Sequence, residues 1–154
     1  MNTVFGSIGI LLDAFFLALL SWCAYTDWKT RAVSNLPVAM LVYLGLVKVV
    51  LTFLPGSALW WHHPAGLLLS IPFLITWYKN NMGAADVKLI MAIGLYLGLL
   101  NTLVSFALMI PILAVSMVCT WLKKRTMKCR IPLAPVLTFG AVATIALRYL
   151  HLPH

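Results

Sequence analysis

Asp13, Asp27 and Asp86 are the only acidic residues among the 154 residues of this chain, which contains no glutamate. Asp27 lies at the end of the first long apolar stretch, and Asp86 lies at the start of a later one. An ionisable carboxyl at the edge of a membrane-spanning segment is costly, and such residues commonly mark functional sites. Acid–base chemistry that depends on carboxyl groups must therefore use these three residues.

Two carboxyl groups that share one site can hydrolyse a peptide bond. One carboxylate activates water, and the other group, as the carboxylic acid, protonates the carbonyl oxygen. Two adjacent carboxylates repel each other, so the pair retains one proton. Asp27 is predicted at the C-terminal end of a helix, which disfavours its ionisation, and Asp86 at an N-terminal end, which favours it. This argument predicts Asp86 as the base and Asp27 as the acid. The alternative is that each aspartate only caps or terminates a helix at the level of the lipid headgroups.

The composition excludes an ordinary soluble domain. The chain is 63% hydrophobic and 9% charged, with a mean hydropathy of +1.01, and so few polar groups cannot cover a water-exposed surface. We therefore predict an all-α polytopic membrane protein that forms a single membrane-embedded domain over residues 1–154. The net charge of +8 favours contacts with membrane lipids over nucleic acid, because the basic residues lie in short loops between apolar runs.

About six membrane-spanning helices are predicted from the apolar runs and their polar, proline and glycine breaks. They cover residues 4–26, 36–54, 58–77, 86–99, 101–121 and 132–150. The run from 86 to 121 is too long for one crossing, so we divide it at residues 98–101, where Gly98 and Asn101 can form a turn. Most lysines and arginines then lie in odd-numbered loops, which predicts that side as cytoplasmic. Asp27 and Asp86 are expected at this cytoplasmic boundary, with both termini outside.

Three residues near the two aspartates have structural explanations from their types. Gly83 lacks a Cβ and lets the backbone that carries Asp86 approach a neighbouring helix or a substrate. Lys88 is expected to reach the lipid headgroups, with a direct catalytic role as the alternative. Asn35 is expected to cap the second helix, which has Pro37 in its first turn.

Two local patterns together resemble a known family of membrane proteases. Asp27, Arg31, Val33 and Asn35 resemble the first signature of the type IV prepilin peptidases, an aspartate followed by a basic residue, a β-branched residue and an asparagine. Residues 83–89, with the sequence GAADVKL, resemble the second signature, the GxGD motif and its following Val-Lys-Leu. The chain departs from the motif at position 85, where alanine replaces the glycine that precedes the aspartate.

The resemblance implies an aspartic endopeptidase with Asp27 and Asp86 as its catalytic pair. Such an enzyme removes the basic leader peptide from prepilin or pseudopilin substrates, after a glycine, at the cytoplasmic face of the bacterial inner membrane. It would need no cofactor and no metal. The chain has no cytoplasmic segment with paired cysteines, so it resembles the short members without methyltransferase activity that serve tight-adherence (Flp-type) or conjugative pili.

The remaining ionisable residues give weaker signals. Asp13 lies near the middle of its predicted helix, about 20 Å from Asp27 along the axis, and we expect a buried, hydrogen-bonded or protonated structural residue. The histidines form two pairs without a supporting carboxylate or cysteine at ligand spacing, so metal binding is not expected; they are His62, His63, His151 and His154.

Two other functions stay open from the sequence alone. In a small proton- or cation-coupled transporter, the same aspartates would lie along the membrane thickness and relay protons or bind a cation. A nonenzymatic assembly protein of a pilus or secretion machine would tolerate asparagine at both Asp27 and Asp86. A peptidase instead needs the two carboxyl groups at one depth, facing each other.

Overall fold

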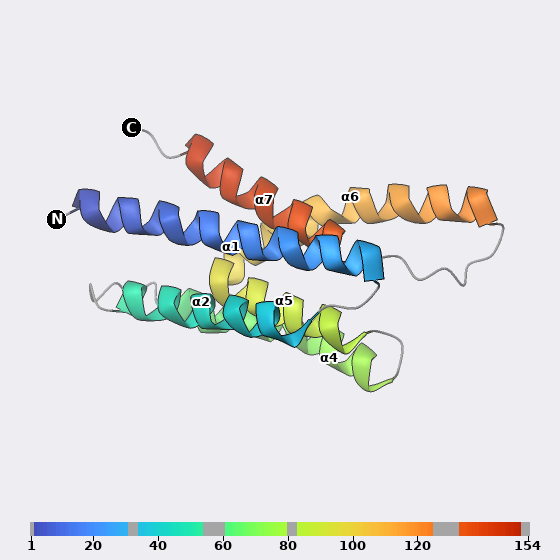
Figure 1. The fold of residues 1–154 in the computed structure, drawn as a ribbon, viewed down its shortest axis with the longest axis horizontal. Coiled ribbons are helices and arrows are strands. Elements are labelled where there is room, and N and C mark those ends of the chain that lie inside the picture. The colour runs from blue at the N-terminus through green and yellow to red at the C-terminus, as the bar shows by residue number, and fades with distance from the viewer. Residues whose placement is uncertain (1, 31–33, 54–60, 80–82, 125–132, 152–154) are drawn as a thin grey trace.

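The computed structural model describes residues 2–30, 34–53, 61–79, 83–124 and 133–151, and within these ranges the chain forms helices without strands. The all-α membrane class predicted from composition is confirmed (Figure 1). In chain order the elements are α1 (Asn2–Thr30), α2 (Asn35–Phe53), α3 (His62–Gly66), the 3₁₀ helix η2 (Leu67–Ser70), α4 (Ile71–Tyr78), α5 (Ala84–Leu97), α6 (Leu99–Lys124) and α7 (Leu133–His151).

The long apolar run from 86 to 121 is divided at Gly98, as predicted. Gly98 has a φ of 80°, a left-handed conformation that favours glycine, and its N–H donates to the carbonyl of Gly94 at 3.0 Å. The side-chain amide of Asn101 donates to the carbonyl of Leu97 at 3.0 Å and so satisfies the last turn of α5. One chain reversal at a single glycine thus separates α5 from α6.

The six predicted segments coincide with helices, except that the third is the succession α3, η2 and α4. Among the described residues, three helical stretches are long and apolar enough to cross a membrane by themselves: Ser7–Thr30, Asn35–Phe53 and Leu133–Leu150. The 14-residue helix α5 is too short for this, at about 21 Å. The number of crossings therefore stays a prediction.

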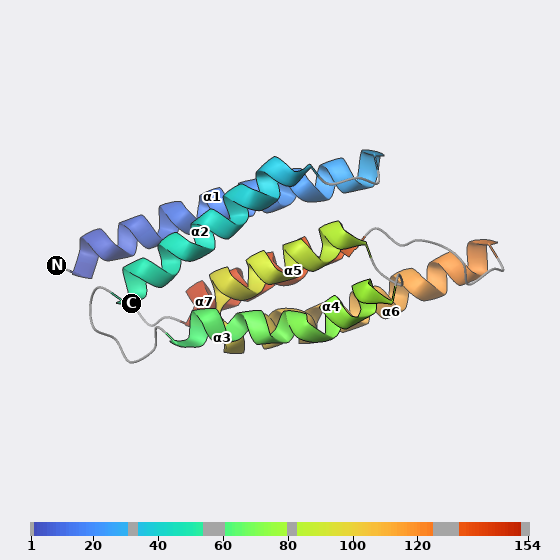
Figure 2. The same cartoon turned by 90° about the horizontal axis from the view of Figure 1, so that it is seen from below.

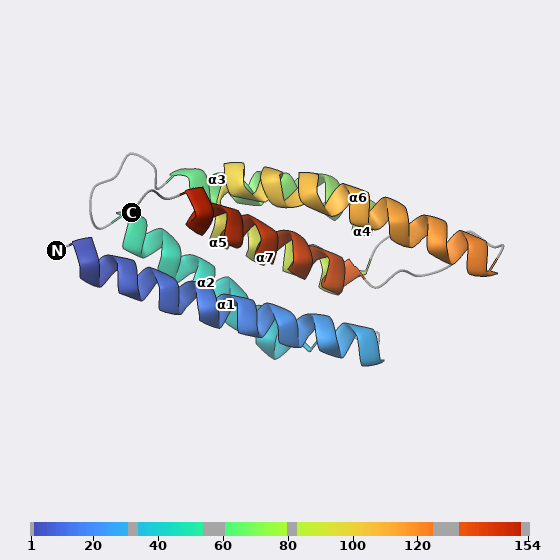
Figure 3. The ribbon, with the colours of Figure 1, turned by 90° about the horizontal axis from the view of Figure 1, so that it is seen from above.

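The helices run side by side along the long axis of the molecule, and both chain ends lie at the same end of the bundle (Figures 1 and 3). At the opposite end α1, α4 and α6 end while α2, α5 and α7 begin. We call this the aspartate end, because Asp27 lies in the last turn of α1 and Asp86 in the first turn of α5. We call the other end, which contains the chain termini, the terminal end.

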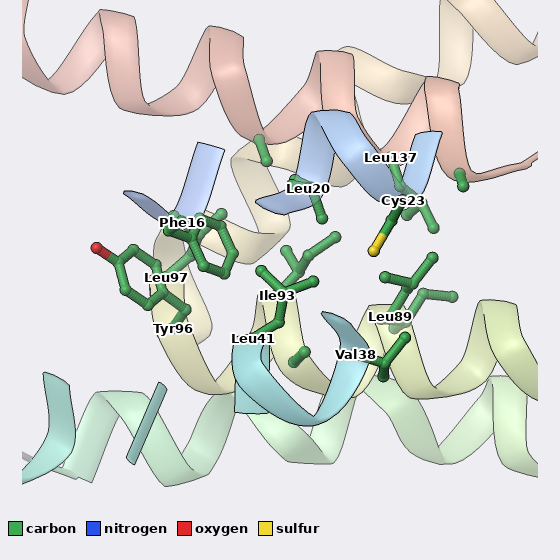
Figure 4. Packing of buried hydrophobic residues seen from close by; sticks show 14 of the residues in the cluster. Phe16, Leu20, Cys23, Val38, Leu41, Leu89, Ile93, Tyr96, Leu97 and Leu137 are labelled. Carbon is green, nitrogen blue, oxygen red and sulfur yellow. The ribbon is translucent and has the colours of Figure 1, made fainter. Parts of the chain in front are cut away.

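Helix α5 occupies the centre of the bundle. It contacts α2, α3, η2, α4, α6 and α7, and nine of its 14 residues are buried. Figure 2 shows α5 between the α1–α2 pair and α4. Its side chains meet those of α1 and α2 in one apolar core, in which the rings of Tyr96 and Phe16 stack 3.8 Å apart (Figure 4). The position of Asp86 is therefore fixed by the most enclosed helix of the molecule.

Two glycines allow α5 to lie against the third helical segment. A Cβ on Gly66 of α3 would overlap the carbonyl of Gly94 in α5, and a Cβ on Gly94 would lie 2.5 Å from the carbonyl oxygen of Gly66. Backbone contact of this closeness requires residues without side chains, as in other tightly packed membrane helices.

Candidate active site

Asp27 is buried at the aspartate end, with 9% of its surface exposed. Its Oδ2 accepts a hydrogen bond from the backbone N–H of Ala134 at 3.4 Å. Ala134 lies in the first turn of α7, where backbone N–H groups have no partner within the helix and favour a nearby negative charge. The start of α7 therefore faces Asp27 with a donor that suits a carboxylate.

The contribution of Ala134 was not identified from the sequence. The first turn of each helix offers free N–H groups, but the sequence does not show which helix start packs against Asp27, since the two residues lie 107 positions apart.

Asp86 lies in the first turn of α5, outside the three stretches that could cross a membrane alone, and it is partly buried. Its burial and, second, the negative charge of Asp27 raise the pKa of Asp86 from an ordinary 3.8 to about 6. This direction is opposite to the one predicted from the helix ends. Because burial removes water from around the carboxyl, Asp86 keeps its proton to a higher pH than an ordinary aspartate does.

The two carboxyl groups thus lie at one end of the bundle, near enough for the charge of one to change the proton affinity of the other. Within the described part of the chain no hydrogen bond joins them directly, and Asp27 instead accepts its hydrogen bond from Ala134. The interaction between them that the structure shows is electrostatic.

Gly83 borders the carboxyl group of Asp86. A Cβ at position 83 would lie 3.1 Å from Oδ2 of Asp86, a contact that would force the carboxyl to shift. The backbone of Gly83 has φ −71° and ψ 140°, which other residues also adopt, so the unusual dihedrals allowed by glycine are not used here. The space beside the carboxyl is what this glycine provides. Ala85, at the motif position that departs from glycine, lies inside α5, where alanine is the best helix former.

Asn35 and Lys88 are brought together by the packing of α2 against α5. The Nζ of Lys88 donates to Oδ1 of Asn35 at 3.2 Å on an exposed surface of the aspartate end. This hydrogen bond therefore joins Asn35 of the first signature to Lys88 of the second. Arg31 lies outside the described residues, so its predicted place in the site stays a prediction.

Asp13 is buried at a different level of the bundle and has partners from three other helices. Lys48 of α2 pairs with Oδ1 at 3.2 Å, and Arg148 of α7 pairs with Oδ2. The hydroxyls of Tyr96 and Tyr149 donate to the same carboxyl at 2.5 and 2.7 Å. Asp13 is therefore the buried, hydrogen-bonded structural residue that was expected. We call these five residues the Asp13 cluster.

The partners of Asp13 were not predicted from the sequence, because they lie 35 to 136 positions away along the chain. The available signal was physical: a cation within an apolar helix must find an anion, and Asp13 is the single acidic side chain in that half of the bundle.

Among the described residues, no group of three or more His, Cys or Asp side chains could hold a metal ion. The ring Nδ1 of His63 lies 3.2 Å from the carbonyl oxygen of Leu95, so this histidine serves the packing of α3 against α5. The described site therefore consists of carboxyl groups and backbone N–H donors.

Comparison with known proteins places this chain in a family. The model of the type IV leader peptidase family matches residues 14–120, a range that includes both Asp27 and Asp86. No curated protein and no solved structure matches the chain. Because the matched range covers more than half of the chain and holds both aspartate motifs, this membrane protein belongs to the type IV leader peptidase family.

Proposed function

We propose that the protein is an aspartic endopeptidase that removes the basic leader from prepilin-like substrates, without methyltransferase activity. The observation that carries the proposal is the electrostatic coupling of Asp27 and Asp86 at one end of the bundle. Family membership supports peptide hydrolysis as the reaction. The proposed site lies at the cytoplasmic face of the bacterial inner membrane, where loop lysines and arginines gather.

In the proposed mechanism Asp27 is the carboxylate and Asp86 is the carboxylic acid. Asp27 takes a proton from a water molecule as its oxygen attacks the carbonyl carbon, and Asp86 gives its proton to the carbonyl oxygen. The resulting gem-diol collapses when Asp86 takes back one hydroxyl proton, Asp27 protonates the amide nitrogen and the C–N bond breaks. Both residues then return to their starting states. The raised pKa of Asp86 and the N–H of Ala134 at Asp27 support this division of roles.

Exposed aromatic side chains support a position of the aspartate end at a membrane interface. Large rings of α1 and α4 lie near the ends of these helices with 44–84% of their surface exposed: Trp22, Tyr25, Trp28, Trp77 and Tyr78. Tryptophan and tyrosine favour the headgroup level of a bilayer. A site at this level could receive an extended peptide segment whose apolar part stays among the lipids while its basic leader remains in water.

The surroundings of Asp13 argue against a proton relay through the membrane. Its two oxygens already accept hydrogen bonds from four side chains. A relay needs a carboxyl that can exchange its proton along a path. Asp13 instead serves as the anchor of an ion-pair cluster, and the peptidase is the function that the observations favour.

The proposal is tested by coexpression with a membrane-inserted reporter that carries a basic leader, a glycine and an apolar helix of about 20 residues. Asp27→Asn and Asp86→Asn are each expected to lower leader removal by about 100-fold or more, because each deletes one proton-transfer group. Gel mobility of the reporter and sequencing of its new N-terminus measure the cut.

Lys29→Gln is the matched control, since Lys29 is an exposed residue of the same helix end, two positions from Asp27. This variant should cleave at the wild-type rate. Immunoblots of the membrane fraction must show equal amounts of all variants. Normal cleavage by either asparagine variant would exclude the proposed pair and favour an assembly role.

A further inference from the structure

The Asp13 cluster contains more positive than negative charge. One carboxylate, Asp13, faces two cations, Lys48 and Arg148, so one positive charge is left over when all three groups are ionised. The tyrosine hydroxyls add hydrogen bonds but no charge. A surplus charge among apolar helices is costly unless an anion from outside the chain accompanies it.

Arg148 is the cation that can reach such an anion. A third of its side chain is exposed, 33%, compared with 14% for Lys48 and 3% for Asp13. It contacts Asp13 and the hydroxyl of Tyr149 through Nη2 alone. Within the described part of the chain its Nε and Nη1 have no hydrogen-bond partner. These N–H groups lie on different sides of the planar guanidinium, and each can donate a hydrogen bond to an anion such as a phosphate.

An apolar groove of about 290 Å³ lies between α1 and α7, next to two residues that Arg148 contacts. Asp13 and Tyr149 border it, and the rest of its lining is aliphatic: Ile10, Ala14, Leu17, Val142, Ile145 and Ala146. The small side chains of Ala14 and Ala146 hollow the surface between the larger ones. Both walls belong to stretches that are long and apolar enough to cross a membrane, so we expect lipid chains rather than water beside the groove.

We propose that this surface binds one anionic phospholipid, with an acyl chain in the α1–α7 groove and its phosphate on the N–H groups of Arg148 that Asp13 does not use. Charge complementarity selects the occupant, because the surplus positive charge favours a lipid with net negative charge over a zwitterionic one. Arg148 lies three residues before the end of α7, which places it near the headgroup level at the terminal end. The lipid therefore comes from the leaflet opposite to the proposed active site.

The experiment uses the full-length protein in a neutral detergent, with dioleoyl phosphatidylglycerol and dioleoyl phosphatidylcholine added separately. Native mass spectrometry is expected to show one retained phosphatidylglycerol and little phosphatidylcholine. Arg148→Gln should weaken phosphatidylglycerol binding by about tenfold or more, the effect of one lost charged hydrogen-bonded contact. Lys29→Gln, which removes a cation from the aspartate end, should bind as the wild type does.

A second variant covers the case in which Arg148→Gln fails to fold. Ala146→Phe fills the groove and leaves the Asp13 cluster in place, so it should also lower phosphatidylglycerol retention. Inorganic phosphate should not compete at equal concentration, because it cannot occupy the groove. Equal retention of the two lipids, unchanged retention by both variants, or full competition by phosphate would each overturn the proposal. None of these results depends on peptidase activity.

Discussion

The hydroxyl of Tyr96 donates a 2.5 Å hydrogen bond to Oδ1 of Asp13, and so joins the two helices that carry the aspartate pair. Tyr96 lies ten residues after Asp86 on α5, and Asp13 lies 14 residues before Asp27 on α1. The Asp13 cluster takes residues from α1, α2, α5 and α7. These four helices also carry the groups of the candidate active site: Asp27 on α1, Asn35 on α2, Asp86 on α5 and the N–H of Ala134 on α7. A directional contact at one level of the bundle therefore sets the helix register at the other.

Tyr96→Phe is expected to lower both stability and cleavage rate. The substitution removes one donor from a buried carboxyl, at a cost of about 1–3 kcal/mol in the free energy of unfolding, while the ring stack on Phe16 is kept. Thermal unfolding in detergent and the rate of reporter cleavage measure the two effects. Tyr43→Phe, at an exposed tyrosine of α2, is the control and should change neither quantity. Equal behaviour of the two variants would show that the hydrogen bond has no such role.

The Asp13 cluster is expected to contribute more to register than to stability. Asp13→Asn leaves two cations facing a neutral amide and should destabilise the protein by about 3–5 kcal/mol. Replacement of the three charged residues together, Asp13→Leu with Lys48→Met and Arg148→Met, should cost much less, because apolar groups substitute well for a buried ion cluster.

The triple variant should nevertheless cleave more slowly than the wild type, since apolar contacts are not directional. Melting temperature and kcat, measured on the same preparation, separate the two effects. Additive destabilisation in the triple variant would contradict the stability argument. A stable triple variant with wild-type kcat would contradict the register argument.

Asp86 is expected to lose its proton near pH 6. Burial first, and then the charge of Asp27, raise its pKa to about 6, so the carboxylic acid is present below this pH and disappears above it. If Asp86 is the acid, kcat should fall as the pH rises through this value. The carboxylic-acid carbonyl band in the infrared can follow the same step, because the chain contains three aspartates, no glutamate and one C-terminal carboxyl.

Two variants assign that step. Asp86→Asn should abolish it, and Asp27→Asn should move it to lower pH, because the second cause of the shift is removed. The midpoint in Asp27→Asn should stay above 3.8, since burial, the larger cause, remains. A band that titrates unchanged in Asp86→Asn would assign the proton to another residue. That result would favour the roles predicted from the helix ends, with Asp86 as the base and Asp27 as the acid.

Gly83→Ala should lower the cleavage rate several-fold without loss of stability. The new Cβ lies 3.1 Å from Oδ2 of Asp86 and displaces the proton donor by a few tenths of an ångström, which affects proton transfer more than folding. Gly9→Ala is the control, because a Cβ there meets no atom within 4 Å. Two measurements separate the variants: kcat should fall only in Gly83→Ala, while the melting temperature should stay the same in both. Full activity in Gly83→Ala would show that the carboxyl tolerates the shift.

Local chemistry explains which features could be predicted from the sequence. Apolar length predicted the helical segments, and Gly98 marked the division of α5 from α6, because a left-handed residue at a chain reversal favours glycine. The alternation of helix directions then predicted Asp27 and Asp86 at one end of the bundle. These inferences need only neighbouring residues and the order of the segments.

Long-range packing explains the rest. The proton affinity of Asp86 depends on how much water its neighbours exclude, and this effect was stronger than the helix-end effect visible in the sequence. The pairing of Asp13 with Arg148 joins residues 135 positions apart, and the N–H of Ala134 reaches Asp27 over 107 positions. Such contacts follow from which helices pack together, a choice that periodicity does not specify.

The contact between Lys88 and Asn35 offers a final test of the motif residues. Both side chains are exposed, so their 3.2 Å hydrogen bond should add less than about 1 kcal/mol to stability. If the bond positions α5 against α2 at the site, Lys88→Met and Asn35→Ala should each raise the KM for the reporter, and the double variant should raise it no further. If Lys88 acts only on lipid headgroups, Asn35→Ala should leave KM unchanged while Lys88→Met alters it. Steady-state cleavage by the four proteins distinguishes a shared role from two separate ones.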